Sequence, residues 1–446
     1  MTLRFGTDGV RGIANRDLTP EVVVAFGRAA ARVLGTERPF LIGRDTRQSG
    51  TMIESALAAG LCAQGASAQS AGVLPTPGLA FLAEVLDAPA AMISASHNPF
   101  PDNGIKLFAA GGRKVADEIE AQLEAELAAV LEVGPGTSPE GAGIGTATRV
   151  AGSVDRYVVH LIQALEGRRL DGLRVVLDCG HGAAYGAAPR AARELGLDLT
   201  VLNATPDGSN INRDCGSTHP GELQRAVVEL GADAGLAFDG DADRVIAVDE
   251  RGRIVDGDHI LLIGAIDLHQ RRKLSHDTIA ATVMSNLGLR RALAEHAIGL
   301  VETPVGDRNV LAAIEGHDLV LGGEQSGHVI YSELATTGDG TLTGLLLLDT
   351  MVRRGRTLSE LAAGMTTFPQ VLRNVTVSDP TAVERAPDFW ARVEAAERAL
   401  GGDGRVLVRR SGTEPVVRVM VEATTLEQAE QVAGALAANV PGAAPD

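Results

Sequence analysis

The sequence predicts an α/β protein built from several domains, and three observations lead to this fold class. The chain has 446 residues, which is too long for one core and suggests about three or four domains. Short β-rich runs alternate with amphipathic helical stretches through most of the chain. The 53 glycines and the Ala-rich helical stretches are typical of α/β layers joined by many glycine turns.

The first elements show this alternation clearly. A helix is expected over residues 20–35, opening at Pro20 and ending at Gly35, and the apolar strand FLIGRD follows at 40–45. RVVLDCG at 174–180 and DLVLGGE at 318–324 have the same strand style. Each ends in Gly or an acid where a loop should begin. Mostly parallel strands with ligand loops at their carboxyl ends are therefore predicted, in three related domains.

Three breaks divide the chain. Residues 133–153 are crowded with Gly, Pro, Ser and Thr and indicate a linker or long surface loop. A second break falls near 255–257, where Asp258 is predicted to cap the next helix. A third lies near 366–370, and the remainder is predicted as helix, strand, loop, strand and helix. The expected domains are residues 1–152, 153–255, 256–368 and 369–446.

Charge and composition exclude several classes of partner. The formal charge of −17 argues against nucleic-acid and acidic-membrane binding, since phosphates demand a basic footprint. A small anion held by a few local arginines stays possible. The three cysteines, at 62, 179 and 215, form no CxxC pair and suit a reducing cytoplasm. No signal peptide is expected, and no apolar run reaches the roughly 18 residues of a membrane span, so a cytoplasmic location is predicted.

The motif DGDADR at 239–244 predicts a metal site. Its three alternating carboxylates can converge on one hard cation, and oxygen-only ligands favour Mg²⁺ or Ca²⁺. A polar turn between strands is the plainer alternative. A calcium EF-hand is a second alternative, but Arg244 stands where that loop needs Gly, and the flanks GLAF and VIAV are strand-like. A metal site on a strand-end loop is favoured over both.

A second candidate site lies in ISASHNPFPDNGIK at 93–106. The Ser96 hydroxyl, in a loop leaving a strand, could be a nucleophile or carry a phosphate. A lone Ser would more often cap a turn, and a lone His97 would more often be structural. Neither alternative accounts for Asn98, Asn103 and Lys106 nearby. No GxSxG elbow surrounds Ser96, so a hydrolase triad is not indicated.

Two further motifs offer groups for a phosphorylated sugar. In RRSGTEPVVRVMVE at 409–422, hydroxyl, amide and guanidinium donors could surround a phosphate dianion, although an ordinary hairpin is the alternative. In GGEQSGH at 322–328, Glu324, Ser326 and His328 suit vicinal sugar hydroxyls or an amine. No GxxxxGK[ST] loop occurs, and DCGHGAAYG departs from the dinucleotide fingerprint, so an NAD enzyme is not expected.

Taken together, these motifs resemble those of the α-D-phosphohexomutase family over essentially the whole chain. They occur in order: FGTDGVRG at 5–12, SASHNP, NGIK, PDGSNINRDCGSTH at 206–219, DGDADR, GGEQSGH and RRSGTEPVVRVMVE. The resemblance implies three similar mixed α/β domains and a smaller C-terminal α+β domain around a central cleft. In chain order these would be the phosphoserine, metal-binding, sugar-binding and phosphate-binding domains.

The resemblance also implies a role for each site residue. Ser96 would carry the phosphoryl group and, with it, complete a Mg²⁺ site formed by Asp239, Asp241 and Asp243. The reacting phosphate would be met by basic residues, and Lys106 or His97 would assist proton transfer. The sugar would contact Glu324, Ser326 and His328. The predicted basic residues are Arg11, Lys106 and Arg244, and the predicted grip on the non-reacting phosphate is Arg409, Ser411, Gly412, Thr413 and Arg418.

The activity implied is transfer of the Ser96 phosphoryl group to a hexosamine phosphate through a 1,6-bisphosphate, with a hexosamine or hexose 1,6-bisphosphate as activator. GGEQSGH favours glucosamine-6-phosphate and glucosamine-1-phosphate, on the route to UDP-N-acetylglucosamine and cell-wall precursors. A mannose or glucose phosphate substrate is one alternative, and a non-catalytic sugar-phosphate-binding protein is another. No nucleic-acid or membrane partner is expected, and the chain would be a monomer or homodimer.

Overall fold

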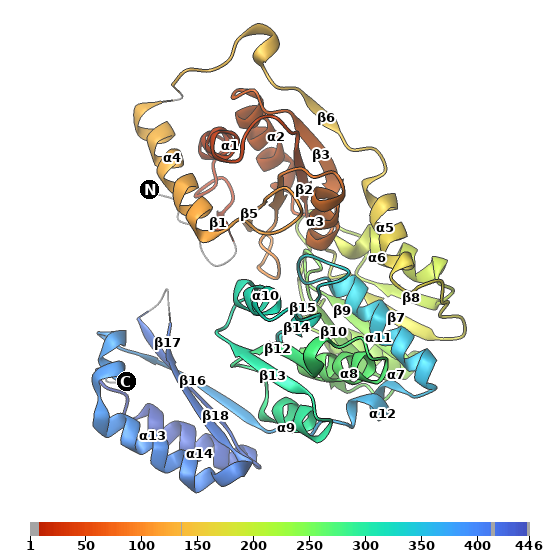
Figure 1. Ribbon diagram of the computed structural model, residues 1–446, viewed down its shortest axis with the longest axis vertical. Coiled ribbons are helices and arrows are strands. Elements are labelled where there is room, and N and C mark those ends of the chain that lie inside the picture. The colour runs from red at the N-terminus through yellow and green to blue at the C-terminus, as the bar shows by residue number, and fades with distance from the viewer. Residues whose placement is uncertain (1–8, 135, 412–414, 444–446) are drawn as a thin grey trace. The chain divides into compact units, whose positions relative to one another are not determined.

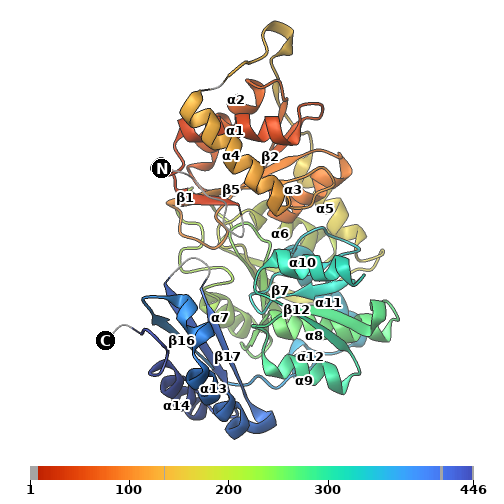
Figure 2. The same cartoon turned by 60° about the vertical axis from the view of Figure 1, so that its left-hand side comes forward.

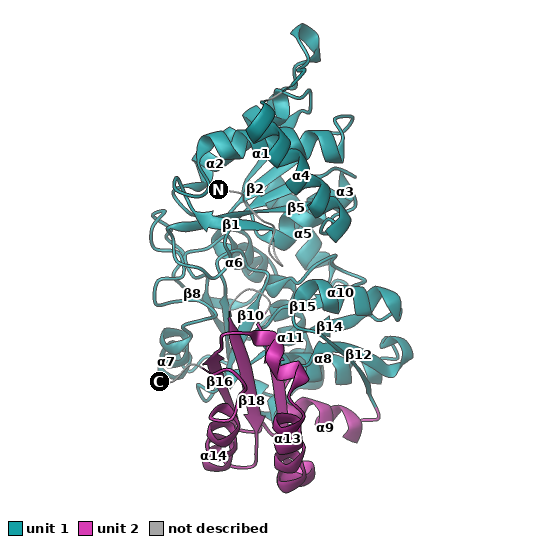
Figure 3. Ribbon diagram, turned by 90° about the vertical axis from the view of Figure 1, so that its left-hand side faces the viewer, with its two compact units in different colours: residues 1–283, 298–363 teal, residues 284–297, 364–446 magenta. Residues whose placement is uncertain are grey.

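The computed structural model describes residues 9–134, 136–411 and 415–443 (Figure 1). Within these residues the strands form four sheets. The chain divides into two compact units, residues 1–283 with 298–363 and residues 284–297 with 364–446 (Figure 3). None of the described helices is long and apolar enough to cross a membrane.

The first unit holds three sheets, each with its own helices. The six-stranded sheet has the order β1 (Val10–Ile13), β5 (Asp102–Phe108), β4 (Ala90–Ile93), β2 (Phe40–Arg44), β3 (Ala68–Val73) and β6 (Ala147–Arg149), with α1 (Pro20–Leu34), α2 (Gly50–Cys62), α3 (Thr76–Val85) and α4 (Asp117–Val133). The five-stranded sheet has the order β11 (Ile254–Val255), β10 (Val245–Asp249), β9 (Ala234–Phe238), β7 (Arg174–Asp178) and β8 (Asp198–Leu202), with α5 (Ser153–Gln163), α6 (Ala184–Glu194) and α7 (Gly221–Leu230). The four-stranded sheet has the order β13 (Gly299–Thr303), β12 (Thr278–Thr282), β14 (Leu321–Gly323) and β15 (Val329–Tyr331), with α8 (Gly257–Gln270), α10 (Asp307–Gly316), α11 (Gly340–Arg354) and α12 (Leu358–Ala362).

These three sheets share one four-stranded core. The orders β5-β4-β2-β3, β10-β9-β7-β8 and β15-β14-β12-β13 are equivalent, and in each the first strand is antiparallel while the other three are parallel. The three similar mixed α/β domains expected from the sequence are therefore confirmed. In each core, one loop leaves the carboxyl end of a parallel strand and returns as the antiparallel strand. These three loops are residues 94–101, 239–244 and 324–328.

The repeat differs in one detail from the sequence-based expectation. FLIGRD and RVVLDCG contain the central strands β2 and β7, but DLVLGGE contains β14, the equivalent of β4 and β9. The central strand of the third core is β12. The three strand endings look alike in sequence because β2, β7 and β14 are all largely buried parallel strands that end in a loop, so a similar ending does not fix the position in the sheet.

The second unit is a three-stranded antiparallel sheet with helices. Its strand order is β16 (Gln370–Thr376), β18 (Val416–Glu422) and β17 (Arg405–Arg410), and α13 (Pro387–Leu400) and α14 (Leu426–Ala437) cover one face (Figure 1, Figure 2). Helix α9 (Leu287–Glu295) also belongs to this unit. The prediction of a small α+β domain is confirmed, but its first strand was missed. β16 is an edge strand of largely exposed side chains, QVLRNVT, without the apolar alternation that marks a half-buried strand.

Three local expectations can be checked at helix ends and linkers. Helix α1 begins at Pro20 as predicted, and the Thr19 side chain accepts from the Val22 amide. The cap of α8 is Asp256, whose carboxylate accepts from the His259 amide, and not Asp258, which lies in the first turn and is buried. The segment 133–153, expected as a linker or surface loop, contributes β6, which pairs parallel with β3.

Candidate active site

The loop after β4 places Ser96 in a constrained position. Ser96 is buried, and its φ of 50° lies in the left-handed region, which costs a non-glycine residue on the order of 1–3 kcal/mol. Its Oγ donates to Asp239 Oδ2 at 2.5 Å and lies 3.4 Å from His97 Nδ1. The predicted nucleophile and the predicted metal loop, which are 143 residues apart in the chain, are therefore in direct contact.

Groups that the sequence did not reveal hold this loop. The Ser96 amide donates to Ser94 Oγ at 2.9 Å, and Ser94 Oγ donates to Asp45 Oδ2 at 2.7 Å. Arg47 donates to Asp45 and to the Ser96 carbonyl, at 2.8 and 2.9 Å. From the second domain, Asn212 Nδ2 donates to the same Ser96 carbonyl at 2.8 Å. The left-handed backbone at Ser96 is thus fixed from both of its peptide groups.

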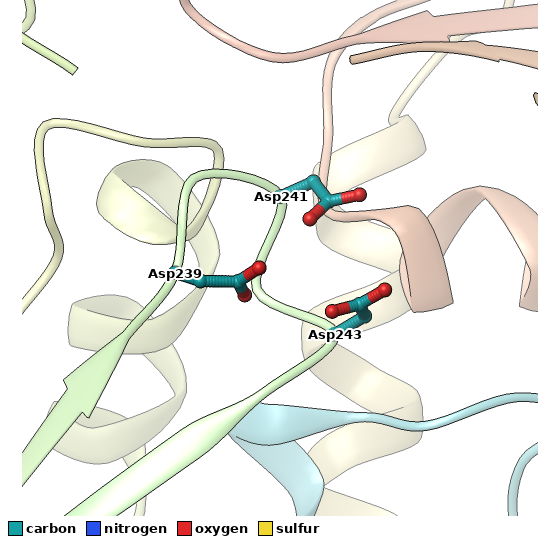
Figure 4. Close-up of side chains that lie close together, drawn as sticks. All are labelled: Asp239, Asp241 and Asp243. Carbon is teal, nitrogen blue, oxygen red and sulfur yellow. The ribbon is translucent and has the colours of Figure 1, made fainter. Parts of the chain in front are cut away.

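The three aspartates of DGDADR converge as predicted (Figure 4). One ligand oxygen from each of Asp239, Asp241 and Asp243 lies within 4.8 Å of the others, and all three side chains are buried. Two carboxylate oxygens, Asp241 Oδ1 and Asp243 Oδ1, are buried without a hydrogen-bond partner among the described residues. Burial and the neighbouring carboxylates raise the pKa of Asp239 well above its ordinary value, so a cation would stabilise the ionised triad.

The donor set of this loop fits Mg²⁺. It offers carboxylate oxygens alone, which a hard cation prefers over zinc or copper. The flanking elements are the strands β9 and β10, which exclude the EF-hand arrangement of two helices. A polar turn explains neither the burial of three carboxylates nor the two buried oxygens that lack partners. The cluster is therefore a candidate site for a divalent metal ion.

Basic side chains surround the triad. Lys106, buried on β5, donates from Nζ to Asp241 Oδ2 at 2.9 Å and lies 3.5 Å from Asp243 Oδ2. Arg244 Nη1 lies 3.2 Å from His97 Nδ1. Burial, then the charges of Arg244 and Arg11, lower the pKa of His97. Arg11 lies on β1 opposite Gly104, and the preceding part of its motif, residues 5–8, lies outside the described residues.

The third loop carries the predicted sugar-binding residues, and it is less buried. Glu324 is half-buried and Ser326 is exposed. Glu324 Oε1 accepts from the Gly306 amide at 3.0 Å, and its Oε2 accepts from Ser326 Oγ at 3.2 Å. The loop before α10 therefore orients this carboxylate through the Gly306 amide.

His328 lies on the other side of the same loop and is buried. Its Nε2 accepts from the Gly338 amide at 3.1 Å, and its Nδ1 lies 3.7 Å from Asp243 Oδ2. An imidazole nitrogen that accepts a backbone N–H is unprotonated, so the ring hydrogen sits on Nδ1 and faces Asp243. The structure thus places the buried His328 ring next to the aspartate triad, whereas Glu324 and Ser326 remain at least partly exposed.

The predicted phosphate-gripping residues lie in the second unit. Arg409 on β17 and Arg418 on β18 are directly opposite each other, and like charges at such a position are unfavourable. Burial, then the charge of Arg418, lowers the pKa of Arg409, whose Nε is buried without a partner among the described residues. Ser411 is buried and its amide donates to the Val416 carbonyl. Gly412 and Thr413 lie outside the described residues.

Sequence reasoning missed five residues that build this site: Asp45, Arg47, Thr76, Ser94 and Asn212. Thr76 Oγ1 donates to Asp241 Oδ2 at 2.6 Å. Two signals pointed in their direction, because the strand FLIGRD ends in charge just before Arg47 and Asn212 lies in the motif NINRDC. Nothing in either segment identified the Ser96 carbonyl as the shared partner, which lies 49 residues from Arg47 and 116 residues from Asn212.

Comparison with known proteins agrees with this fold and site. Four family profiles match in order: phosphoglucomutase/phosphomannomutase alpha/beta/alpha domain I at residues 2–133, domain II at 155–252, domain III at 256–368 and the C-terminal domain at 372–439. The chain belongs to the phosphoglucomutase/phosphomannomutase family, whose members are the phosphohexomutases.

Within this family, several curated phosphoglucosamine mutases are similar to this chain over nearly its full length. The one from Rhodococcus opacus is 53% identical over 444 residues, which cover 98% of each chain. Those from Nocardia farcinica and Salinispora arenicola are each 52% identical; the first match covers 97% of this chain and 98% of the relative, and the second covers 99% of both.

Solved structures share the fold over the whole chain. A phosphoglucomutase/phosphomannomutase family protein from Burkholderia thailandensis has a TM-score of 0.80 at 26% identity and covers 98% of each chain. An N-acetylphosphoglucosamine mutase from Aspergillus fumigatus, in complex with GlcNAc-6P and magnesium, has a TM-score of 0.72 at 20% identity and covers 100% of this chain and 96% of the other. The second likeness bears on the fold alone.

Proposed function

We propose that this protein is a phosphoglucosamine mutase, an isomerase that interconverts glucosamine-6-phosphate and glucosamine-1-phosphate. The observation that carries the proposal is the contact between the buried Ser96 hydroxyl and Asp239 within a triad of carboxylates. The full-length similarity to curated phosphoglucosamine mutases supports the substrate. The phosphomannomutase and phosphoglucomutase alternatives are not favoured, since relatives that share about half of their residues with this chain are named phosphoglucosamine mutases.

In this proposal, Ser96 carries the phosphoryl group. The bond between phosphorus and Ser96 Oγ breaks as a hydroxyl oxygen of the sugar phosphate bonds to phosphorus, which gives a 1,6-bisphosphate. The other phosphate of this intermediate then returns to Ser96 Oγ, and a hexosamine or hexose 1,6-bisphosphate can load Ser96 in the same way. When Ser96 is unphosphorylated, its hydroxyl donates a hydrogen bond to Asp239 Oδ2, with 2.5 Å between the two oxygens.

Asp239, Asp241 and Asp243 would hold Mg²⁺, with an oxygen of phosphorylated Ser96 as a further ligand. Bound there, the ion would neutralise charge on the transferring phosphoryl group. The Lys106 ammonium pairs with the carboxylates of both Asp241 and Asp243, and Arg244 Nη1 lies 3.2 Å from His97 Nδ1. Lys106 and His97 are the candidates for moving the proton of the sugar hydroxyl, and Arg11 adds positive charge near them.

The remaining residues divide into sugar and phosphate contacts. Glu324 and Ser326 would bind the hydroxyls or the C2 ammonium of the sugar, because Gly306 holds the Glu324 carboxylate at a half-buried surface. Arg409, Ser411, Gly412, Thr413 and Arg418 would grip the non-reacting phosphate. An anion between Arg409 and Arg418 would relieve their repulsion. A ring of donors that recognises phosphate, whichever carbon carries it, would accept both ends of the bisphosphate.

His328 acts, in our proposal, through Asp243. Its buried ring is fixed by the Gly338 amide and turns its Nδ1 hydrogen toward that carboxylate. Such an outer contact orients a metal ligand. The domain boundaries at 152, 255 and 368, the cytoplasmic location and the monomeric or homodimeric state complete the proposal.

The substrate assay tests this proposal. Purified protein with Mg²⁺ should convert glucosamine-6-phosphate to glucosamine-1-phosphate with a kcat/KM at least about a hundredfold above those for mannose and glucose phosphates, which corresponds to one or two lost polar contacts. The reverse ranking would assign the chain to another branch of the family. Absence of turnover with all three substrates would favour a sugar-phosphate-binding protein.

A further inference from the structure

We propose that Arg47 is a positioning residue for phosphoryl transfer. Its buried side chain would hold the Ser96 loop in the reactive conformation. The inference rests on the proposed function, since it gives the Ser96 loop a catalytic task. Arg47 follows β2 and its side chain is completely buried, so it touches neither solvent nor a substrate in the site. Its effect on the reaction would pass entirely through the residues it contacts.

Every N–H of the Arg47 guanidinium is used. Nε donates to Asp45 Oδ2 at 2.8 Å, and Nη2 donates to the carbonyls of Ser96 and Asn98 at 2.9 and 2.8 Å. Nη1 donates to the Asp102 carbonyl at 3.0 Å and to the Pro99 carbonyl. One planar group with five donors therefore ties together four carbonyls of the segment 96–102.

These carbonyls belong to the turn that gives Ser96 its left-handed backbone. The amide of Ser96 is also linked to the Asp45–Arg47 ion pair. This amide donates to Ser94 Oγ, and Ser94 Oγ donates to Asp45. Asp45 is also held by Arg47, through the backbone amide at 2.9 Å and through Nε. The Asp45–Arg47 pair thus fixes the direction in which Ser96 Oγ points toward Asp239.

The second domain meets this loop at the same two carbonyls. Asn212 Nδ2 donates to the Ser96 carbonyl at 2.8 Å and to the Asn98 carbonyl at 3.1 Å. Each carbonyl oxygen has two lone pairs, so Arg47 and Asn212 can bind the same oxygens together. Arg47 therefore fixes the conformation of the loop within the first domain. Asn212 connects the same loop to the second domain, which carries the aspartate triad.

A lysine could not reproduce this arrangement. Its ammonium has three donors on a flexible stem and lacks the planar fork, so at most three of the five contacts could be kept. A purely structural buried ion pair would need no contact with the four loop carbonyls. The number of bonds to one short segment is what points to positioning of Ser96.

Four variants and one small molecule test the proposal. Arg47→Met keeps the length and apolar volume but has no donor, Arg47→Lys keeps the charge, and Arg47→Ala leaves a cavity that guanidinium could fill. Arg190→Ala is the control, because Arg190 is an exposed arginine of α6 that pairs with Asp155 and Glu194. Measurements are kcat and KM for glucosamine-6-phosphate, and amide hydrogen exchange of the segment 94–102.

We expect Arg47→Met and Arg47→Lys to lower kcat by about a hundredfold, as for a misplaced reacting group, with KM changed less than about threefold. Amides of residues 94–102 should exchange faster while those of β2 and β4 stay protected. Guanidinium at about 50 mM, far below denaturing concentrations, should raise kcat of Arg47→Ala at least tenfold and leave Arg47→Met unchanged. The neutral analogue urea should not restore either variant.

Unchanged exchange and unchanged kcat in Arg47→Met would overturn the proposal, and so would an equal response of the Met and Ala variants to guanidinium. Should Arg47 variants fail to fold, Asn212→Ala removes two bonds to the same carbonyls and should raise exchange of 94–102 and lower kcat about tenfold. Unaltered exchange there would also count against the loop being held in this way. The exchange measurement needs no substrate, so a wild-type protein inactive on glucosamine-6-phosphate would refute the proposed function alone.

Discussion

The reacting loop (residues 94–101) and the recognition loop (residues 324–328) follow equivalent strands in two different sheets. They are nevertheless held by different kinds of contact. Ser96 follows β4 and is buried, with the carbonyl and amide of its own backbone bound by Arg47, Asn212 and Ser94. Glu324 follows β14 and is half-buried, and its carboxylate is oriented by the Gly306 amide and Ser326. The first arrangement fixes a backbone, whereas the second orients a side chain that still reaches solvent.

This difference accords with two kinds of chemistry. Phosphoryl transfer needs atoms held in line, where small displacements are costly. Recognition of a sugar that must bind in two orientations needs donors and acceptors that remain accessible. Changes near the first loop should therefore act mainly on kcat, and changes at the second should act mainly on KM.

The largest effect is expected at the metal loop. Asp241→Asn removes one negative charge from the triad and weakens the contact with Lys106, so kcat should fall about 10³-fold, while KM changes little. Asp198→Asn, at an exposed position on β8, is the control and should behave as the wild type. Steady-state kinetics at saturating Mg²⁺ measure both. An unchanged kcat in Asp241→Asn would remove the triad from the reaction.

The next effect concerns the recognition loop. Glu324→Gln keeps the shape but loses the charge that could meet an ammonium or several hydroxyls, so KM for glucosamine-6-phosphate should rise about tenfold with kcat nearly unchanged. Glu229→Gln, at an exposed position on α7, is the matched control. A loss confined to kcat would mean that the two loops do not divide the work as proposed.

A smaller effect separates the two possible tasks of His328. His328→Asn can keep a donor near the Nδ1 position, whereas His328→Gln can keep only the acceptor that meets the Gly338 amide. Binding of Mn²⁺, measured by electron paramagnetic resonance, should weaken about tenfold in the Gln variant and much less in the Asn variant. If both variants instead bind the metal normally and raise KM for the sugar, His328 is a sugar ligand.

The smallest effect concerns the pH dependence of stability at Asp339, which follows the Gly338 that binds His328. Burial raises the pKa of Asp339 from its ordinary 3.8 to about 6, although the Leu342 amide and the Tyr157 hydroxyl bind this carboxyl. Because the folded pKa is the higher one, the favourable contribution is complete below about pH 3.8 and is lost as pH rises through about 6.

Asp339→Asn should therefore become more stable relative to the wild type as pH rises from about 4 to 7, by at most on the order of 3 kcal/mol. Thermal unfolding of both proteins across this range, compared by the difference in Tm, measures the change. A difference that is flat with pH would show that Asp339 ionises at its ordinary pKa in the folded protein.

The sequence predicted the residues of the candidate active site better than the residues that hold them in place. SASHNP and DGDADR identified the loops because they occur in one chain in the order that the family shows, although each motif alone could be a plain turn. In the structure the Ser96 hydroxyl donates to Asp239 Oδ2. Arg47 and Asn212 were not identified, because their partners are carbonyl groups in another part of the chain, which leave no mark on the local sequence. The edge strand β16 was missed for a related reason, since it lacks the apolar pattern that burial imposes.

The most direct test follows the phosphate on Ser96. Protein labelled with radioactive phosphate at Ser96 is mixed with glucosamine-6-phosphate in a single turnover, and the label is traced by peptide mapping and by chromatography of the sugars. The account predicts that label leaves Ser96 and appears first in glucosamine 1,6-bisphosphate, at a rate no slower than kcat. Label that stays on Ser96 while glucosamine-1-phosphate forms, or that passes to inorganic phosphate, would contradict the account.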